Sequence, residues 1–345
     1  MQPVTRRQFL IAAGGSAIAA VIASCAPQLT SNNAATPSSG SAPTAVPQVI
    51  EPPKKIYLSS IEGLYQQNYA STPDVDEKSW FMQIDGLVDS PLKLDMTEIK
   101  SLPKYDDVRT LECIGNPVGG NLIGNVEWNG IRLKDLLAKV KIDPKATHVN
   151  FQAADGYYTS VELDWLMQDR TLLAYGLNGA PLTPDHGFPL RINMPGLYGQ
   201  KMPKWITHME FTNNPVTGFW ESQGWSNTAD VQTNSKFSEP HNGQHLEPGQ
   251  NPVFGVAFAG KNKITKVEVS ADGQNWINCD LLQGDSPLVW TQWSGVWEAQ
   301  PGKYEMEVRA TDETGFTQNI PSGGYLAQSY PKGTSAIATV AVRVE

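Results

Sequence analysis

Residues 110–120 read TLECIGNPVGG and join an apolar, strand-like run to a loop of Gly, Asn and Pro. Cys113 stands at that junction. A strand end holds a side chain rigidly, and a glycine-rich loop lets backbone amides and a large ligand come close. A lone thiol in this setting is a soft-metal ligand, a nucleophile or a small buried hydrophobe. Because free cysteines are usually buried, this stretch alone does not decide between chemistry and packing.

The bulk composition indicates a globular protein of two domains with extra segments. The chain has 345 residues, of which 40% are hydrophobic and 18% charged, and this length predicts two domains. A formal net charge of -9 argues against a nucleic-acid partner, because no basic surface is in excess. The three cysteines are Cys25, Cys113 and Cys279. Their odd number argues against a disulfide framework, and their scatter argues against a zinc site.

Residues 1–25 have the features of an export signal. The segment TRRQFL at residues 5–10 is a twin-arginine motif, and a short apolar run from Leu10 to Ala23 follows it. The run ends in IASC, so that small residues precede Cys25 as in a lipobox, which predicts lipidation of Cys25. The alternatives are an uncleaved anchor or ordinary cleavage after small residues. Residues 26–55 are rich in Ser, Thr, Ala, Asn and Pro, which predicts a disordered linker.

The export signal has consequences for location and chemistry. We expect the protein at the extracytoplasmic face of the cell membrane or in the periplasm, attached to the membrane only through a lipid anchor. The twin-arginine route carries folded proteins. A protein usually needs it because a cofactor must be inserted before export, so the signal makes a cofactor more probable without identifying it.

Residues 56–238 form the first predicted domain, of the α+β class. Strands are expected at residues 80–87, 149–153 and 157–163, and a short helix at 94–102. Further short strands are expected at 108–111, 126–128 and 190–194, and residues 172–175 form an apolar run. Asn129-Gly130 reads as a turn, and apolar residues from Ile131 to Val140 recur at helical spacing, which predicts a helix of about three turns. Strands and short helices alternate irregularly, which favours α+β.

Basic residues cluster in rigid loops near the end of this domain. His186 and Arg191 lie on a Gly/Pro-rich segment, and Lys201 and Lys204 follow in a loop that contains two glycines. Guanidinium and ammonium groups beside glycine-rich backbone can cradle a phosphate. For each basic residue alone, a solvated surface charge is the more common explanation. The clustering makes an anionic ligand about as probable as surface placement.

Residues 239–345 form the second predicted domain, a β-sandwich. Short alternating strands are expected at 253–259, 264–270, 276–282, 290–297, 304–310 and 337–344, separated by turn signals. Cys279 falls within one of these strands and is interpreted as a packing residue. His241 and His245 are four residues apart, but they flank the turn-like stretch NGQ, so a metal site there is disfavoured.

Three long segments together resemble the sulfite oxidase family of molybdopterin-dependent oxidoreductases. They are LECIGNPVGGNLIGNVEWNGIRLKDLL (111–137), LLAYGLNGAPLTPDHGFPLRINMPGLYGQKMPKWI (172–206) and GFWESQGW (218–225). The resemblance covers most of residues 75–345 and rests on long, ordered motifs. It implies a sulfite oxidase-type molybdopterin-binding domain followed by an immunoglobulin-like domain that mediates dimerisation, and therefore a homodimer.

The resemblance also implies roles for individual residues. Cys113 matches the family's molybdenum-binding cysteine, and a soft, anionic sulfur suits such a metal. His186, Arg191 and Lys204 match positions that grip the pterin cofactor and its phosphate.

Two further site residues are implied less directly. Tyr157 matches a tyrosine near the metal, with Tyr158 as the alternative one residue away, and an ordinary half-buried strand tyrosine is the plain alternative. Asn68 lies before the well-matched core and is carried as a candidate on the cofactor side.

One departure from the family pattern bears on the substrate. Sulfite oxidases carry arginines directly after the Cys-x-Gly-Asn element, where they help to bind sulfite, whereas here Asn116 is followed by Pro117-Val118-Gly119-Gly120. A sulfite dianion would therefore lose a charge-assisted partner. This makes a neutral organic substrate, such as a sulfoxide, an alternative to sulfite.

The predicted function is two-electron oxygen-atom transfer on a small substrate by an exported molybdenum-cofactor oxidoreductase. The sequence has no Cys-x-x-Cys-His haem motif, GxGxxG loop or P-loop, so an external electron carrier such as a cytochrome is expected. One alternative is a reductase of an organic sulfoxide or N-oxide on the same fold. The other is a cofactor-less binding or scaffold protein.

Overall fold

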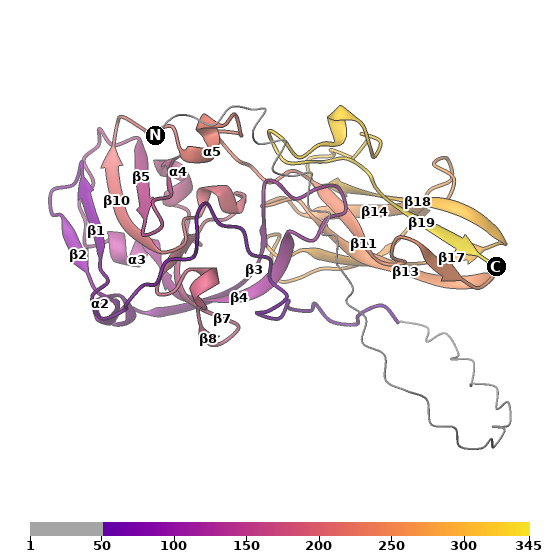
Figure 1. Ribbon diagram of the computed structural model, residues 1–345, viewed down its shortest axis with the longest axis horizontal. Coiled ribbons are helices and arrows are strands. Elements are labelled where there is room, and N and C mark those ends of the chain that lie inside the picture. Colours follow the sequence, from indigo (N-terminus) through magenta and orange to yellow (C-terminus); the bar gives the residue numbers. More distant parts are fainter. Residues whose placement is uncertain (1–50) are drawn as a thin grey trace, which may run out of the picture. The chain divides into compact units, whose positions relative to one another are not determined.

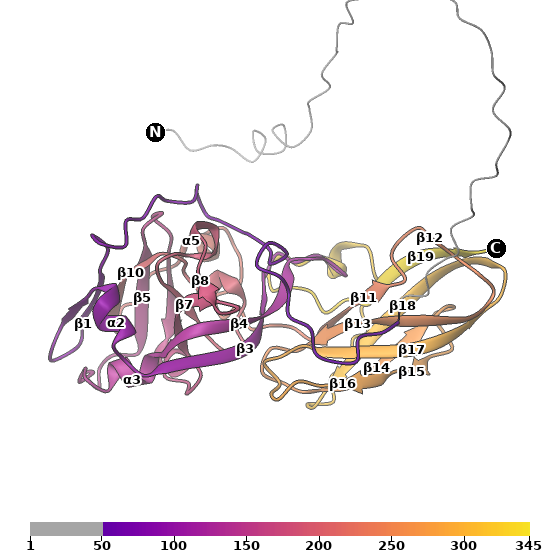
Figure 2. The same cartoon turned by 90° about the horizontal axis from the view of Figure 1, so that it is seen from below.

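A computed structural model describes residues 51–345, whose regular secondary structure is mostly β-strand with few, short helices (Figures 1 and 2). The predicted signal, the predicted lipidation site Cys25 and most of the predicted linker lie outside the described residues. No helix within residues 51–345 has the length and apolar character needed to cross a membrane. The helical segments are α2 (Met96–Lys100), α3 (Leu133–Leu137), α4 (Leu163–Leu166), α5 (Phe219–Ser222) and the 3-10 turns η1 (Pro184–His186), η2 (Gly199–Lys201) and η3 (Tyr325–Ala327).

Two sheets form the part of the chain that precedes β11. The first has the order β2-β1-β10-β5-β6, in which only β1 and β10 pair in parallel. Its strands are β1 (Met82–Gly86), β2 (Leu92–Leu94), β5 (His148–Ala153), β6 (Tyr158–Glu162) and β10 (Ile206–Thr212). The second has the order β3-β4-β7-β8, with β9 paired to β7. Its strands are β3 (Lys104–Glu112), β4 (Ile123–Arg132), β7 (Leu172–Leu177), β8 (Ala180–Pro181) and β9 (Arg191–Asn193).

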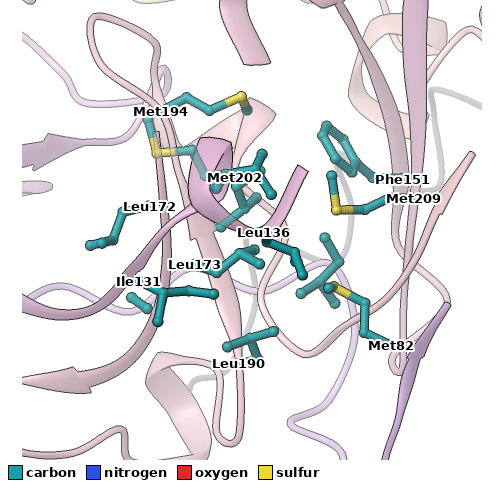
Figure 3. Packing of buried hydrophobic residues seen from close by; sticks show 14 of the residues in the cluster. Met82, Ile131, Leu136, Phe151, Leu172, Leu173, Leu190, Met194, Met202 and Met209 are labelled. Atoms are coloured by element: carbon teal, nitrogen blue, oxygen red, sulfur yellow. The ribbon is translucent and has the colours of Figure 1, made fainter. Parts of the chain in front are cut away.

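A single hydrophobic cluster fills the space between these two sheets and α3. Figure 3 shows Leu136 of α3 in its centre, with Phe151 and Met209 from the first sheet and Leu173 from the second around it. Met209, Phe151 and Leu173 are fully buried. Burial of such side chains is the main force that fixes the two sheets relative to each other. The sheets in turn fix the loops that leave their strand ends.

The predicted three-turn helix at residues 131–140 is wrong in its length. Only Leu133–Leu137 is helical. Ile131 and Arg132 remain in β4, where they pair with Leu173 and Leu172 of β7. The sheet pairing overrides the helical spacing of the apolar residues, because each residue in the ladder gains hydrogen bonds and buried contacts across the strand pair.

The predicted turn at Asn129-Gly130 is also wrong, because both residues lie inside the long strand β4. The pairing register with β7 shifts between Asn129 and Gly130, which marks a bulge. A Cβ atom at Gly130 would lie 2.1 Å from the carbonyl oxygen of Leu173. Because Gly130 has no side chain, the two strands can approach closely there, and the chain does not reverse at this position.

Replacing Gly130 with alanine is expected to lower the free energy of unfolding by about 3 kcal/mol or more, because backbone atoms must move to admit the methyl group. Gly179→Ala is the matched control. Gly179 has a φ of 77°, but no atom lies within 4 Å of its Cβ position, so only the left-handed backbone penalty of about 1–2 kcal/mol applies. Urea unfolding of both variants measures the difference. Equal losses would contradict the steric argument.

Residues from Asn234 onward build two further sheets. One has the order β11-β13-β17-β16 and the other the order β12-β19-β18-β14-β15. The strands of the first are β11 (Asn234–Glu239), β13 (Gly249–Phe258), β16 (Asp280–Leu282) and β17 (Thr291–Ala299). Those of the second are β12 (Gln244–Leu246), β14 (Ile264–Ser270), β15 (Ile277–Asn278), β18 (Gly302–Asp312) and β19 (Ala338–Val344).

Both of these sheets contribute to one hydrophobic cluster, as in two sheets packed face to face. Trp293 of β17 and Met306 of β18 are buried in it. The predicted strand at residues 276–282 is broken at Cys279, because β15 pairs with β14 in one sheet and β16 pairs with β17 in the other. Cys279 packs against the cluster, as predicted, although it is only partly buried.

The strand β3 belongs to the first group of sheets, and its end points toward the second group in Figure 2. The amide of Thr110 donates to the carbonyl oxygen of Leu288 at 2.8 Å, and the Thr110 hydroxyl accepts from the amide of Trp290 at 2.9 Å. Thr110 lies three residues before Cys113. These two hydrogen bonds therefore tie the end of β3 to residues 288–290.

Candidate active site

Six residues predicted from sequence line one cavity of about 180 Å³. They come from separate parts of the chain: the segment before β1, the end of β3, the start of β6, the turn η1, β9 and the loop before β10. The residues are Asn68, Cys113, Tyr157, His186, Arg191 and Lys204. Within residues 51–345 no group of three or more His, Cys, Asp and Glu side chains gathers as a metal cluster. A metal in this cavity would therefore depend on the thiol and on ligands that a cofactor brings.

Cys113 follows directly after β3 and is held by backbone hydrogen bonds. Its amide donates to the Leu122 carbonyl at 2.9 Å, and its carbonyl accepts from the Asn116 amide at 2.9 Å. The thiol is free. Burial raises the pKa of the Cys113 thiol, and a hydrogen bond from the Gly115 amide lowers it by a smaller amount. A metal cation bound to the sulfur would hold this partly buried thiol as a thiolate.

Glu112 directly precedes Cys113 and was not predicted as a site residue. Its side chain is buried and accepts hydrogen bonds from the amides of Asn116 (2.9 Å) and Asn234 (3.0 Å). Burial raises its pKa to about 7, and the two amide hydrogen bonds oppose that rise. Glu112 thereby joins the Gly-Asn-Pro loop to the second pair of sheets. Nothing in the local sequence pattern distinguishes it from an exposed strand residue.

Arg191 is a buried cation without a carboxylate partner among the described residues. Its Nη1 donates to the His186 carbonyl at 3.2 Å, its Nε has no hydrogen-bond partner, and its guanidinium lies 4.8 Å from the Trp128 ring centroid. Burial lowers the pKa of Arg191 to about 10. An unpaired buried guanidinium facing a cavity destabilises the protein unless an anion binds there. This feature fits an anionic group in the cavity.

Lys204 gives the cavity a second cation. Its Nζ donates to Asn68 Oδ1 and, at 2.7 Å, to the Asp185 carbonyl. Asn68 in turn donates to Thr72 at 3.0 Å. The pKa of Lys204 is lowered to about 7, first by burial and then by the charge of Arg191. The structure thus brings Asn68 to the cavity through Lys204, although the sequence match at Asn68 was weak.

The lowered pKa of Lys204 predicts a pH dependence of stability in the cofactor-free protein. The folded state binds fewer protons at this lysine than the unfolded state between about pH 7 and the ordinary lysine pKa of 10.5. The free energy of unfolding should therefore rise with pH across that interval. In Lys204→Met this rise should be smaller, as measured by urea unfolding at a series of pH values. An identical pH profile in the variant would contradict the assignment.

His186 lies at the end of η1 and is buried. Its Nδ1 is 2.7 Å from the Thr183 hydroxyl, and its Nε2 is 3.4 Å from the Leu64 carbonyl. A ring nitrogen that faces a carbonyl oxygen must carry the proton, so Nδ1 accepts from Thr183. Burial lowers the pKa of His186, and the charge of Arg191 lowers it further. The neutral imidazole lines the cavity, and its backbone carbonyl orients Arg191.

Of the two tyrosines considered, the structure places Tyr157 in the cavity and exposes Tyr158. Alternation along the strand accounts for the difference, because successive side chains point to opposite faces. The Tyr157 phenol donates to the Gln200 carbonyl at 2.5 Å. Burial and the charge of Glu221 raise the pKa of Tyr157 well above its ordinary value. Tyr157 is therefore protonated at neutral pH.

An aromatic wall completes the cavity and was not assigned from sequence. Tyr69, Trp220 and Trp225 line it together with Tyr157. The Tyr69 ring stacks edge-on with Phe219 at 4.4 Å, and Trp225 packs edge-on against Tyr330 at 5.1 Å. The two tryptophans belong to the segment GFWESQGW. The resemblance of this segment to the family is the sequence signal that could have identified them as cavity residues. Tyr69 had no comparable signal.

The structure separates two features that sequence reasoning placed near the ligand. Lys201, expected in the anion cradle with Lys204, is buried in an ion pair with Glu221 and does not line the cavity. Pro117-Val118-Gly119-Gly120 also lie outside it. Val118 packs against the hydrophobic cluster of the second pair of sheets, and the Gly120 carbonyl accepts from Lys236 at 2.8 Å. The residues that stand in place of the expected arginines are therefore not cavity residues.

Comparison with known proteins identifies relatives over most of the chain. The family of oxidoreductase molybdopterin-binding domains matches residues 69–220. The uncharacterized oxidoreductase YuiH of Bacillus subtilis is 37% identical over 163 residues, which are 47% of this chain and 80% of YuiH. The sulfite oxidase of Arabidopsis thaliana is 31% identical over an alignment of 289 positions that covers 68% of this chain and 73% of that protein.

Among solved structures, the sulfane dehydrogenase SoxCD of Paracoccus pantotrophus has a similar fold. The TM-score is 0.71 at 21% sequence identity, and the match covers 81% of each chain. The prediction of a sulfite oxidase-type fold is thereby confirmed. The relatives are oxidoreductases, so these matches do not support the cofactor-less scaffold alternative.

Proposed function

The chain belongs to the sulfite oxidase-like family of molybdopterin-dependent oxidoreductases, and from this premise we propose that the cavity around Cys113 catalyses two-electron oxygen-atom transfer on a small substrate. The observation that carries the proposal is the convergence in one cavity of a partly buried thiol, a partly buried lysine and a buried guanidinium that has no carboxylate partner among the described residues. When bound, the molybdenum cofactor supplies a two-electron redox centre that exchanges an oxygen atom between water and substrate.

The residues of this chain fit that cofactor. Cys113 offers the soft sulfur that suits the metal. Arg191 and Lys204 offer charge to an anionic cofactor, and Arg191 has a free N–H group with which to bind it. His186 and Asn68 hold these two cations in place through their own hydrogen bonds. The Tyr157 phenol is protonated and donates to the Gln200 carbonyl, so its oxygen can accept a hydrogen bond from water or a protonated substrate group.

Two substrate classes compete. Sulfite is supported by the relatives and by the two cations of the cavity. An organic sulfoxide or N-oxide is supported by the aromatic wall of Tyr69, Trp220 and Trp225, because aromatic side chains favour organic groups over small dianions. We propose sulfite-type oxidation as the first function and organic S-oxide or N-oxide reduction as the second.

A substrate panel run in both directions tests the proposal. The purified holoenzyme is assayed with an artificial electron acceptor against sulfite and thioethers, and with an artificial donor against sulfoxides and N-oxides. Turnover of sulfite with the acceptor supports the first function, and turnover of sulfoxides with the donor supports the second. No turnover in either direction by protein that contains molybdenum would contradict oxygen-atom transfer.

The cellular setting is part of the proposal. The twin-arginine motif and the sequence before Cys25 support export and a lipid anchor, and an external electron carrier such as a cytochrome would exchange electrons with the site. The sheets of residues 234–345 are proposed as an immunoglobulin-like dimerisation domain. We expect an Arg6→Lys/Arg7→Lys variant to be retained in the cytoplasm and a Cys25→Ala variant to be released from membranes. Light scattering should give the mass of a dimer.

A further inference from the structure

Tyr325 and Leu326 are the most exposed large apolar side chains in the part of the chain that the structure describes. Their exposed fractions are 77% and 75%. They are neighbours on η3, in the segment between β18 and β19 that Figure 1 draws in yellow. Single exposed apolar residues are ordinary on protein surfaces, whereas apolar side chains that are exposed together are a feature of surfaces that bind a partner.

The support of these two side chains is fixed. The amide of Ile337 donates to the carbonyl of Ile320 at 2.8 Å, which closes the base of the segment that carries η3. Ala327, the next residue after the exposed pair, is buried, and its carbonyl accepts from the Thr334 hydroxyl at 3.1 Å. A surface that is held in place before binding loses little conformational entropy when a partner docks.

The same segment contacts the wall of the candidate active site. The Tyr330 ring packs edge-on against Trp225, with 5.1 Å between the ring centroids. The amide of Ser226 donates to the carbonyl of Pro331 at 2.9 Å. A Cβ atom at Gly224 would lie 2.2 Å from the Tyr330 hydroxyl, so the two segments are in close contact. Because Trp225 lines the cavity, residues 320–337 support this wall from outside.

Trp225 also approaches the candidate metal ligand. A Cβ atom at Gly115 would lie 3.7 Å from Cys113 Sγ and 3.7 Å from Cη2 of the Trp225 indole. A single glycine therefore separates the indole from the sulfur. A molecule that docks on residues 320–337 would lie beside the segment whose aromatic ring reaches Cys113.

The proposed function requires a partner at such a position, and the inference rests on that function. In oxidation, substrate and water give oxygenated substrate, two protons and two electrons, and reduction reverses the same balance. The sequence has no haem-attachment motif and no dinucleotide-binding loop, so the two electrons pass to or from another redox protein. That protein has to bring its own redox centre close to the cavity. Its docking surface is therefore expected beside the cavity wall.

Charge and size favour an electron carrier over a second copy of this chain. Residues 314–344 contain no Asp or Glu, and Lys332 and Arg343 are their only charged residues. Such a surface suits a partner with an uncharged, apolar rim, because charged rims pair with charged surfaces. A stable dimer interface takes about 20–30 residues from each partner, whereas weak redox complexes bury much less. Two exposed apolar side chains fit the smaller, transient contact.

We propose that Tyr325 and Leu326 form the docking surface for the external electron carrier, a small cytochrome whose exposed haem edge is surrounded by uncharged, apolar side chains. The cytochrome binds transiently and exchanges one electron in each encounter, so that two encounters complete one turnover. Tyr325 and Leu326 do not line the cavity. They therefore affect electron exchange with the cytochrome and leave substrate binding unchanged.

Tyr325→Ser/Leu326→Ser tests this surface in the holoenzyme. Ferricyanide serves as the small-molecule acceptor, and a purified c-type cytochrome with an apolar rim around its haem edge serves as the protein acceptor. For a reductase, reduced methyl viologen and the reduced cytochrome replace them. We expect kcat/KM for the cytochrome to fall about tenfold or more, with turnover and substrate KM in the small-molecule assay unchanged. Raising the salt concentration from about 20 to about 200 mM should change kcat/KM for the cytochrome less than about twofold, because the contact carries little charge.

Ile277→Ser/Val296→Ser is the matched control, because it removes two exposed apolar side chains from β15 and β17. It should keep the wild-type kcat/KM for the cytochrome. An unchanged kcat/KM in Tyr325→Ser/Leu326→Ser would overturn the docking surface alone, as would a wild-type protein that turns over with the small molecule but not with the cytochrome.

Two further outcomes have separate meanings. A lower mass of Tyr325→Ser/Leu326→Ser in light scattering would assign the pair to a contact between copies of this chain and would overturn its role in docking the cytochrome. Wild-type protein that contains molybdenum and shows no turnover with the small-molecule carriers would overturn the proposed function itself.

Discussion

Cys113→Ser is expected to lower turnover by at least about a hundredfold, a loss of about 2.7 kcal/mol in transition-state stabilisation. The backbone around residue 113 is fixed by the bonds to Leu122 and Asn116, so the substitution changes one ligand atom and little else. A hydroxyl oxygen is harder than a thiolate sulfur and has a much higher pKa, so it suits the metal less well. The measurement is kcat, normalised to molybdenum content, with the substrate that the panel identifies.

Cys279→Ser is the matched control, because it makes the same substitution outside the cavity. Cys279 packs against the cluster of the second pair of sheets, and its removal should leave turnover per molybdenum at the wild-type value. Full turnover per molybdenum in Cys113→Ser would contradict a role for the thiol in catalysis.

Arg191→Met is expected to change cofactor content and the stability of the cofactor-free protein in opposite directions. Cofactor content should fall to a small fraction of the wild-type value, because the cavity loses a buried cation with a free N–H group. The cofactor-free protein should gain about 1 kcal/mol or more in the free energy of unfolding, because an unpaired charge no longer has to be buried. Pterin fluorescence after acid release and urea unfolding measure the two effects.

Arg132→Met provides the control for this experiment. Arg132 is paired with Asp135 at 3.2 Å and does not line the cavity, so cofactor content should be unchanged. Wild-type cofactor content in Arg191→Met would contradict its role. Lower stability of the cofactor-free variant would show that the guanidinium serves the fold, through the His186 carbonyl and the Trp128 ring.

The sequence predicted the site residues better than the elements that carry them. Cys113, His186, Arg191 and Lys204 were named from residue types and long motifs, and the structure brings them into one cavity. Their spacing along the chain could not show this, because the contacts between β3, η1, β9 and the loop before β10 are long-range. The resemblance to a known family supplied that information.

The errors have a common physical origin in tertiary contacts that override local patterns. Ile131 and Gly130 follow helix and turn patterns, yet pairing with β7 keeps both in a strand. Lys201 and Lys204 are three residues apart in a loop, yet one is neutralised by Glu221 and the other faces the cavity. Charge and loop context alone could not separate the two lysines, because the partner carboxylate lies twenty residues further along the chain.

The contact between Thr159 and Glu221 had no signal in the sequence. Thr159 lies in a strand and Glu221 in a short helix, and only the folded chain brings them within 2.8 Å of each other. Trp220 and Trp225 of the aromatic wall stand in a recognised segment, but whether their rings face the cavity depends on how that segment packs. Such features follow from the assembled fold and not from local propensity.

X-ray absorption at the molybdenum edge tests the central claim most directly, since it reports the atoms bound to the metal at this site. We predict that wild-type holoenzyme contains molybdenum and that Cys113→Ser either loses the metal or retains it with one sulfur neighbour fewer. A Cys113→Ser protein with the full metal content and an unchanged sulfur shell would contradict the assignment of Cys113, and with it the location of the active site.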